Sequence, residues 1–125
     1  MKILPIALVS LLAVAVPGFA QEPGNPAVYA PGEMARAEFT LDQRTDEGGR
    51  LTPFYTNYRP NIAFGGGQPM KCEFFTEQEG GHKPGTVGEI GMTCPVTISV
   101  GQAFTAYERK RLIGRGVILP PLDGQ

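Results

Sequence analysis

Glycine and proline are too frequent in this chain for a helical protein. The 125 residues include 17 Gly and 12 Pro, and both types interrupt helices, glycine through its backbone freedom and proline through its missing N–H. Beyond the N-terminal apolar segment, no stretch of useful length places apolar residues at helical spacing. Turn-forming residues between short apolar runs are typical of strands joined by short connections. We therefore predict an all-β domain.

Alternation of apolar and polar residues marks the first strand. Ala37, Phe39 and Leu41 fall on one side of an extended chain, and polar residues fall on the other. In the last strand, Gly114 and Gly116 indicate close backbone approach or the sharp curvature of a small barrel. Six strands around one core predict a closed or nearly closed antiparallel β-barrel. These strands are expected over residues 35–42, 61–64, 70–76, 87–99 with a bend at Pro95, 103–108 and 111–118.

The first 20 residues have the pattern of a signal peptide. Lys2 supplies a basic start, residues 3–16 are almost entirely apolar, and a Pro-Gly pair then breaks any helix. Gly18 and Ala20 are small residues at the two positions that a signal peptidase inspects, which predicts cleavage after Ala20. The alternative is a retained membrane anchor, but the apolar run is short for a bilayer span of about 20 residues.

This N-terminus predicts a periplasmic or secreted protein that keeps no transmembrane segment after cleavage. Residues 21–34 are rich in Pro and Gly and are expected to form a flexible leader. The β-barrel domain is expected over residues 35–118. Residues 119–125 are expected to form a C-terminal tail, because their two consecutive prolines cannot continue a central strand.

The charge balance gives no electrostatic reason to expect nucleic acid or an anionic membrane as a partner. Eleven Lys and Arg side chains accompany 12 Asp and Glu side chains, for a formal net charge of −1. One basic cluster stands out near the C-terminus. A solvated surface is its favoured interpretation, and a site for an anion or an acidic partner is the alternative. The cluster consists of Arg109, Lys110, Arg111 and Arg115.

Two cysteines, Cys72 and Cys94, are the only ones in the chain. In an oxidising compartment we expect them to form a disulfide, which closes a loop and stabilises the fold by about 3 kcal/mol. Two buried free thiols are the alternative, since cysteine is among the most buried residue types. No metal site is expected, because two isolated thiols and one distant histidine lack the spacing of metal ligands.

Three segments carry a family pattern. Residues 47–60 contain Glu-Gly-Gly-Arg, Thr-Pro-Phe and Tyr-Arg-Pro in order, and Pro84-Gly85 is followed by a later proline and glycine. Residues 104–118 have Phe-x-x-x-Glu-x-x-Arg-x-x-Gly-x-Gly. Together the segments resemble the third, C-terminal domain of elongation factor Tu, a translation GTPase, over roughly residues 35–118. The resemblance implies a six-stranded β-barrel that performs no chemistry itself.

The resemblance also implies binding positions. In that family the domain packs on the GTPase domain, contacts the exchange factor and grips the T-stem of aminoacyl-tRNA. Arg50 of the Glu-Gly-Gly-Arg loop is retained here, and Asn61 and Glu108 stand at two of the T-stem positions. The family's Val-Thr-Gly motif is replaced by Pro69-Met70-Lys71. Nucleic acid is therefore not the expected partner.

No catalytic or cofactor motif is present. The chain lacks the Gly-x-x-x-x-Gly-Lys-Ser/Thr phosphate loop, so neither GTP nor another cofactor is expected. His82 lies in a polar, Gly-rich loop and is expected to be exposed and solvated. Arg50 and Arg59 flank the signature turn, and the favoured interpretation is structural, because one guanidinium can bond several loop carbonyls at once. The sequence predicts a protein that is not an enzyme.

Taken together, the sequence predicts an exported, non-catalytic β-barrel that binds a protein or an envelope component. The alternative is a nucleic-acid or anion binder that uses the basic hairpin and the Glu-Gly-Gly-Arg loop. The dependence of binding on salt distinguishes the two, because complexes with nucleic acid weaken steeply as salt rises.

Overall fold

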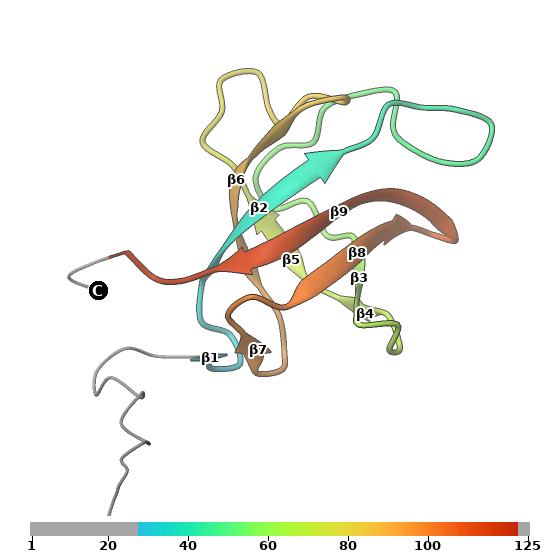
Figure 1. Ribbon diagram of the computed structural model, residues 1–125. Coiled ribbons are helices and arrows are strands. Elements are labelled where there is room, and N and C mark those ends of the chain that lie inside the picture. Colours follow the sequence, from blue (N-terminus) through green and yellow to red (C-terminus); the bar gives the residue numbers. More distant parts are fainter. Residues whose placement is uncertain (1–27, 123–125) are drawn as a thin grey trace, which may run out of the picture.

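The fold is all-β, as the sequence predicts. A computed structural model describes residues 28–122, and within that range it contains nine β-strands and no helix (Figure 1). The expected signal peptide, residues 21–27 of the expected leader and residues 123–125 lie outside the described residues. The strands are β1 Val28–Tyr29, β2 Ala35–Leu41, β3 Asn61–Phe64, β4 Met70–Lys71, β5 Glu73–Phe75, β6 Val87–Thr93, β7 Ile98–Ser99, β8 Ala103–Glu108 and β9 Arg111–Leu119.

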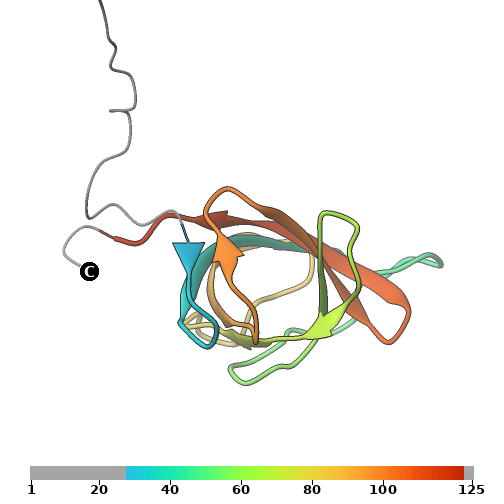
Figure 2. The same cartoon turned by 90° about the horizontal axis from the view of Figure 1, so that it is seen from below.

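Seven of the strands form one antiparallel sheet that curls into a nearly closed barrel. The strand order is β4-β3-β8-β9-β2-β6-β5, and β1 and β7 form a separate two-stranded sheet. Figure 2 shows the strands arranged around a common interior. The hairpin of β8 and β9 turns at Arg109-Lys110, and β2 lies on the other side of β9. These three strands form the wall on which the candidate site lies.

The barrel sheet has seven strands where the sequence predicts six. The difference arises at Cys72, which interrupts the strand expected over residues 70–76. The first piece, β4, pairs with β3, whereas the second piece, β5, pairs with β6. One short segment therefore supplies both ends of the sheet and brings them together. The strand expected over residues 87–99 also divides on either side of Pro95, into β6 and β7.

The disulfide between Cys72 and Cys94 is present, as expected from the sequence. Cys72 lies at the break between β4 and β5, and Cys94 directly follows β6. Both residues are buried. The bridge thus joins the two sides of the seam at which the barrel closes. The disulfide is compatible with an extracellular location. In the described part of the chain, no helix has the length and apolar character needed to cross a membrane.

The core is built from the inward-facing residues of the strands. The predicted alternation in β2 is confirmed, because the residues at 35, 37, 39 and 41 are all fully buried. Phe39 lies among aromatic rings, with centroid distances of 5.1 Å to Phe74 and 6.0 Å to both Phe54 and Phe104. Such ring contacts stabilise a core beyond the area that they bury. They also connect β2, β5 and β8 across the interior.

Two glycines in β9 allow the sheet to pack tightly on this aromatic core. A Cβ atom on Gly114 would lie 2.3 Å from the Thr40 carbonyl oxygen, and one on Gly116 would lie 2.4 Å from the Phe104 ring. No side chain fits at such distances. The close backbone approach predicted from these glycines is therefore confirmed.

The described fold begins earlier than the sequence indicates. Val28 and Tyr29, which fall in the expected leader, pair with Ser99 and Ile98 of β7. Tyr29 is only 3% exposed, and its hydroxyl donates a 2.7 Å hydrogen bond to the Leu119 carbonyl. The strand β9 also runs one residue further than expected, through Leu119. Part of the leader is thus an integral element of the domain.

Candidate functional site

Arg50 of the signature loop is used inside the fold. Its Nε donates a 3.0 Å hydrogen bond to the Thr52 carbonyl, and Nη2 donates a 3.1 Å bond to the Pro53 carbonyl. Its Nη1 forms an ion pair with Glu108. The guanidinium carbon also lies 4.8 Å from the centre of the Tyr58 ring, and only 16% of the side chain is exposed. The structural interpretation of Arg50 is confirmed by these bonds, which hold an irregular segment that lacks strand partners.

Glu108, at the end of β8, completes the cluster. Its carboxylate accepts bonds from Arg50 and, at 2.9 Å, from the Tyr58 hydroxyl. Burial raises the pKa of Tyr58, so the hydroxyl stays protonated and able to donate. The structure therefore brings together two of the three binding residues implied by the resemblance. Asn61 begins β3, and no hydrogen bond joins its side chain to the other two within residues 28–122.

The basic residues of the hairpin do not form a uniformly positive surface. A shallow hollow of about 360 Å³ lies against the turn between β8 and β9, and three carboxylates line it together with three cations. Mixed charges of equal number cancel over short distances, which leaves little field to attract a polyanion. Arg115 lies elsewhere, on the barrel wall beside Asp42. The hollow at the turn between β8 and β9 is lined by Asp46, Glu47, Glu108, Arg109, Lys110 and Arg111.

His82 is buried, so the expectation of a solvated histidine is wrong. Its side chain is 0% exposed, and its ring stacks on Phe54 with centroids 5.0 Å apart. Nε2–H donates to the Thr86 carbonyl at 3.2 Å, and Nδ1 accepts from the Gln78 amide at 3.2 Å. Burial lowers the pKa of His82 and outweighs the bond to Thr86, which raises it. An antiparallel backbone pairing between Phe54 and His82 turns this loop toward the core. No local pattern in the sequence predicts this pairing.

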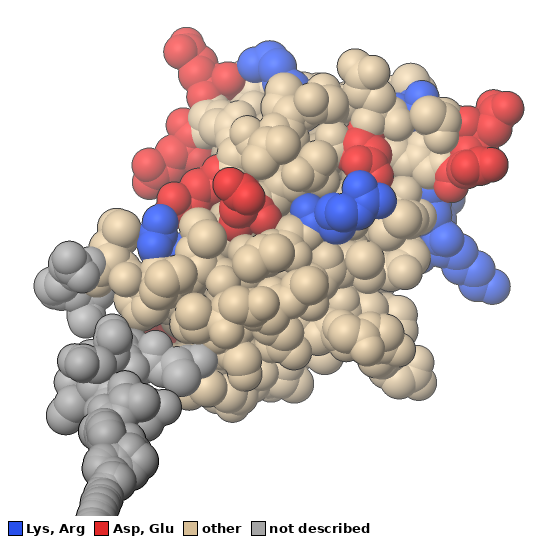
Figure 3. All heavy atoms as spheres, in the orientation of Figure 1, with Lys and Arg blue, Asp and Glu red and all other residues tan. Residues whose placement is uncertain are grey.

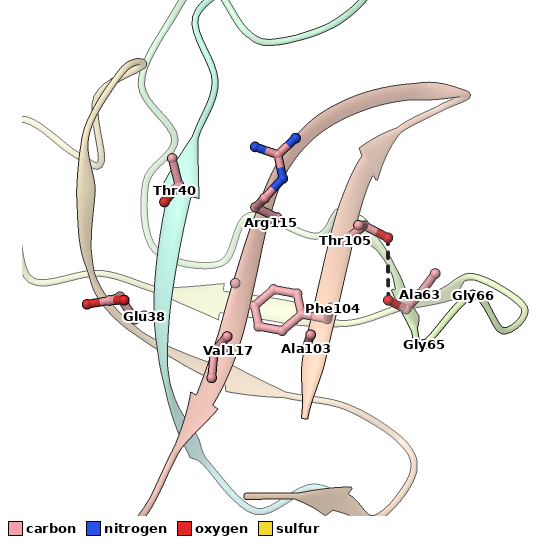
Figure 4. Close-up of a pocket in the computed structure, with 11 residues that line it drawn as sticks. Glu38, Thr40, Ala63, Gly65, Gly66, Ala103, Phe104, Thr105, Arg115 and Val117 are labelled. Carbon is pink, nitrogen blue, oxygen red and sulfur yellow. Dashed lines mark hydrogen bonds between the residues drawn. The ribbon is translucent and has the colours of Figure 1, made fainter. Parts of the chain in front are cut away.

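A second hollow lies on the outer wall of the barrel, and sequence reasoning missed it. It has a volume of about 390 Å³ and lies where β2, β9, β8 and the end of β3 meet. Figure 4 shows the side chains that surround it. The strand register places Thr40, Arg115 and Thr105 in one row across β2, β9 and β8. The neighbouring row of outward-facing residues, two positions along each strand, consists of Glu38, Val117 and Ala103.

Small residues make the wall hollow at this point. Ala63, Ala103 and Thr105 project little beyond the sheet, and Gly65 and Gly66 turn the chain away from it with positive φ angles of 57° and 80°. Longer side chains of β2 and β9 flank this low floor. In sequence these small residues are indistinguishable from ordinary surface positions, and only the pairing of β3 with β8 brings them together.

The two charged residues of the hollow are poorly neutralised within the described fold. Glu38 has no hydrogen-bond or ion-pair partner among residues 28–122, and it lies opposite another carboxylate, Glu89. Arg36 neutralises Glu89 through bonds of 2.7 and 2.9 Å, and this bonding lowers the pKa of Glu89. The Arg115 side chain is 58% exposed, and its only ion pair within the described range is a 3.5 Å contact with Asp42. Both groups are therefore available to a ligand.

Charge is unevenly distributed around this hollow. Figure 3 shows acidic and basic side chains over the upper part of the face and almost none over the lower part, where β7, β4 and the start of β8 lie. The sequence explains this pattern, because residues 60–70 and residues 90–107 contain no Asp, Glu, Lys or Arg. Val117 of the hollow is 42% exposed. Exposed apolar surface rimmed by polar groups is typical of interaction sites.

Comparison with known families leaves the chain unassigned, because no protein-family model matches it. Across residues 28–122, no group of three or more His, Cys, Asp or Glu side chains is placed to hold a metal ion. We take the outer hollow as the candidate functional site because it combines a recessed floor with two weakly neutralised charges, Glu38 and Arg115.

Proposed function

We propose that this chain is an exported, non-catalytic β-barrel module that binds a protein partner through the hollow on its outer wall. The observation that carries the proposal is the hollow itself. It combines a floor of small residues, an exposed valine and two charges with little or no internal neutralisation. Protein interfaces commonly combine an apolar centre with polar groups at the rim.

Kinship with the third domain of elongation factor Tu is part of this proposal. The all-β barrel supports it, and so does one contact. Arg50 comes from the first segment of the family pattern and Glu108 comes from the third, and the two side chains form an ion pair. A motif whose residues bond each other is retained for the sake of the fold, without its original ligand.

Export is proposed on two grounds. The N-terminal 20 residues have the composition of a signal peptide. The disulfide between Cys72 and Cys94 also suits an oxidising compartment, because cytosolic thiols are kept reduced. We place the mature protein in the periplasm or outside the cell.

The arrangement of polar groups supports binding over catalysis. General acid–base chemistry needs a titratable group within reach of a substrate. His82 is fully buried, with both ring nitrogens bonded. The Arg50–Glu108 pair is likewise engaged with its own loop. Nucleic-acid binding has less support, because the cations of the hairpin share their hollow with three carboxylates.

The proposal is tested by affinity capture with a matched pair of variants. Val117→Arg fills the hollow with a long cation, whereas Val96→Arg makes the same change at a valine that is 37% exposed, in the loop after β6 and away from the hollow. The immobilised protein is incubated with envelope extract, and bound proteins are identified by mass spectrometry. We expect a partner that the wild type and Val96→Arg retain and that Val117→Arg loses.

Two outcomes would contradict the proposal. Equal capture by both variants would remove the hollow as the binding surface. Recovery of RNA alone, abolished by nuclease and weakened steeply between low and moderate salt, would replace it with the nucleic-acid alternative.

A further inference from the structure

The two charges of the hollow lie on one diagonal of the sheet. In the register of β2 and β9, Glu38 is opposite Val117 and Thr40 is opposite Arg115. Glu38 and Arg115 are thus diagonal neighbours, at a typical separation of about 7–8 Å, and no ion pair joins them. Val117 and Thr40 occupy the other diagonal. In this patch of four residues, Glu38 therefore lies on one side of the uncharged diagonal and Arg115 lies on the other.

Such a pattern is self-complementary. In a symmetric dimer with two faces in contact, the twofold axis lies in the plane of the interface and exchanges one half of the patch with the other. An axis along the diagonal from Val117 to Thr40 exchanges the positions of Glu38 and Arg115. Each Glu38 then meets the Arg115 of the other copy, which gives two ion pairs. Val117 lies next to the axis and meets its own counterpart.

We propose that the occupant of the hollow face is a second copy of this chain, joined about that axis. The inference rests on the proposed function, since it takes the hollow to be the binding surface and names its partner. The Glu38 carboxylate, which has no partner among the described residues, gains a cation. Arg115, which is 58% exposed, gains a carboxylate in addition to Asp42.

The surroundings of the patch favour self-association over mutual repulsion. Two copies of one surface present the same charges to each other, and like charges placed together cost free energy. Here the strands below the hollow come mostly from residues 60–70 and 90–107, which carry no charged side chain, and β4 adds Lys71. The net charge of the chain is only −1.

Sedimentation equilibrium tests the inference on the protein in the processed form that cells accumulate. We expect a reversible dimer. Val117→Lys should abolish it, because two cations then lie beside the axis. Glu38→Arg and Arg115→Glu should each weaken it at least about tenfold, because each places like charges opposite each other twice. The double variant Glu38→Arg/Arg115→Glu exchanges the charges between strands and should restore the dimer.

Restoration by the double variant excludes simple misfolding of the single variants. Lys110→Glu, an exposed charge reversal in the hairpin, is the matched control and should leave the dimer unchanged. A protein that remains monomeric up to its solubility limit overturns the inference. A dimer that is indifferent to the three face variants overturns it equally. In either case, capture that is still lost in Val117→Arg leaves the proposed binding module standing with a different partner.

Discussion

Charged side chains differ in their bonding between two regions of the barrel. These are the loop end, where Arg50 meets Glu108, and the outer wall that carries the hollow. At the loop end, Arg50 and Glu108 bond each other, the Tyr58 hydroxyl and nearby backbone carbonyls. On the wall, Glu38 has no partner within the described range, and Arg115 makes one long contact. The motif residues Arg50 and Glu108 thus use their polar groups in bonds within the fold. The binding surface that we propose lies where the sequence has no distinctive residue.

Burial explains this difference. A charge that is taken largely out of water must be paired and hydrogen-bonded, or the fold loses several kcal/mol. An exposed charge has no such requirement, and surface ion pairs are worth little to stability. Only 16% of the Arg50 side chain is exposed, against 58% of Arg115. Motif residues at the loop end are therefore expected to act on stability, and residues of the wall on association.

The largest effect on stability is expected at the seam, which belongs to neither region. Replacement of both cysteines, Cys72→Ala with Cys94→Ala, should lower the free energy of unfolding by about 3 kcal/mol, because the unfolded chain regains the freedom of the closed loop. Urea denaturation measures this loss. If the barrel is one cooperative unit, amide hydrogen exchange should accelerate equally at the loop end and at the wall. Acceleration confined to one region would show that the two regions unfold separately.

The two faces of β9 provide the next comparison. Gly114→Val should cost about 2–3 kcal/mol, because the added side chain overlaps the Thr40 carbonyl and the Phe39 ring. Val117→Ala, on the outward face of the same strand, should change stability by less than about 0.5 kcal/mol. Thermal and urea unfolding of both variants measure the contrast. Similar losses at both positions would mean that the wall is as tightly constrained as the interior.

A pair of arginine variants compares the two regions directly. Arg50→Met should lower the free energy of unfolding by about 2 kcal/mol. The loss should be smaller than for breaking a fully buried ion pair, because Glu108 is 35% exposed and partly solvated. Arg115→Met should cost less than about 1 kcal/mol. Urea unfolding at neutral pH gives both values. An Arg50→Met protein as stable as the wild type would refute the structural role of the signature loop.

A fall in pH from 7 to 5 should lower the stability of the fold through His82, by less than the substitutions above. The pKa of His82 is lowered in the folded state, so the folded protein holds the proton less tightly than the unfolded chain does. Stability is then fully present above the unfolded-state pKa of about 6.5 and declines as the pH falls below it. His82→Gln should remove this part of the pH dependence. Melting temperatures between pH 7 and pH 5 for both proteins test this, and parallel curves would contradict it.

Local patterns in the sequence predicted much of the barrel and little of the site. The burial of β2 and the close approach at Gly114 follow from alternation and glycine content. The split at Cys72 did not, because it depends on β4 and β5 pairing with two different strands. The inclusion of Val28 and Tyr29 depends equally on a distant partner, β7.

The same limit applied to the functional residues. The structural role of Arg50 was predictable, since one guanidinium among irregular backbone has few other uses. His82 was misjudged because a Gly-rich polar loop indicates exposure, whereas its pairing with Phe54 turns the ring into the core. The floor of the hollow depends on alanines, glycines and a threonine from β3, β8 and the turn after β3. No spacing along the chain could have revealed it.

The closed seam has a consequence for how this protein can accumulate. An open sheet edge offers a row of free N–H and C=O groups, onto which further molecules can add strand by strand until fibres form. In this barrel the outermost strands are consecutive pieces of one segment, fastened by a disulfide. Within residues 28–122, the barrel sheet therefore has no long free edge for such growth, and a contact with twofold symmetry, as proposed for the wall, ends at two subunits. Such a molecule can reach high local concentration while avoiding polymerisation.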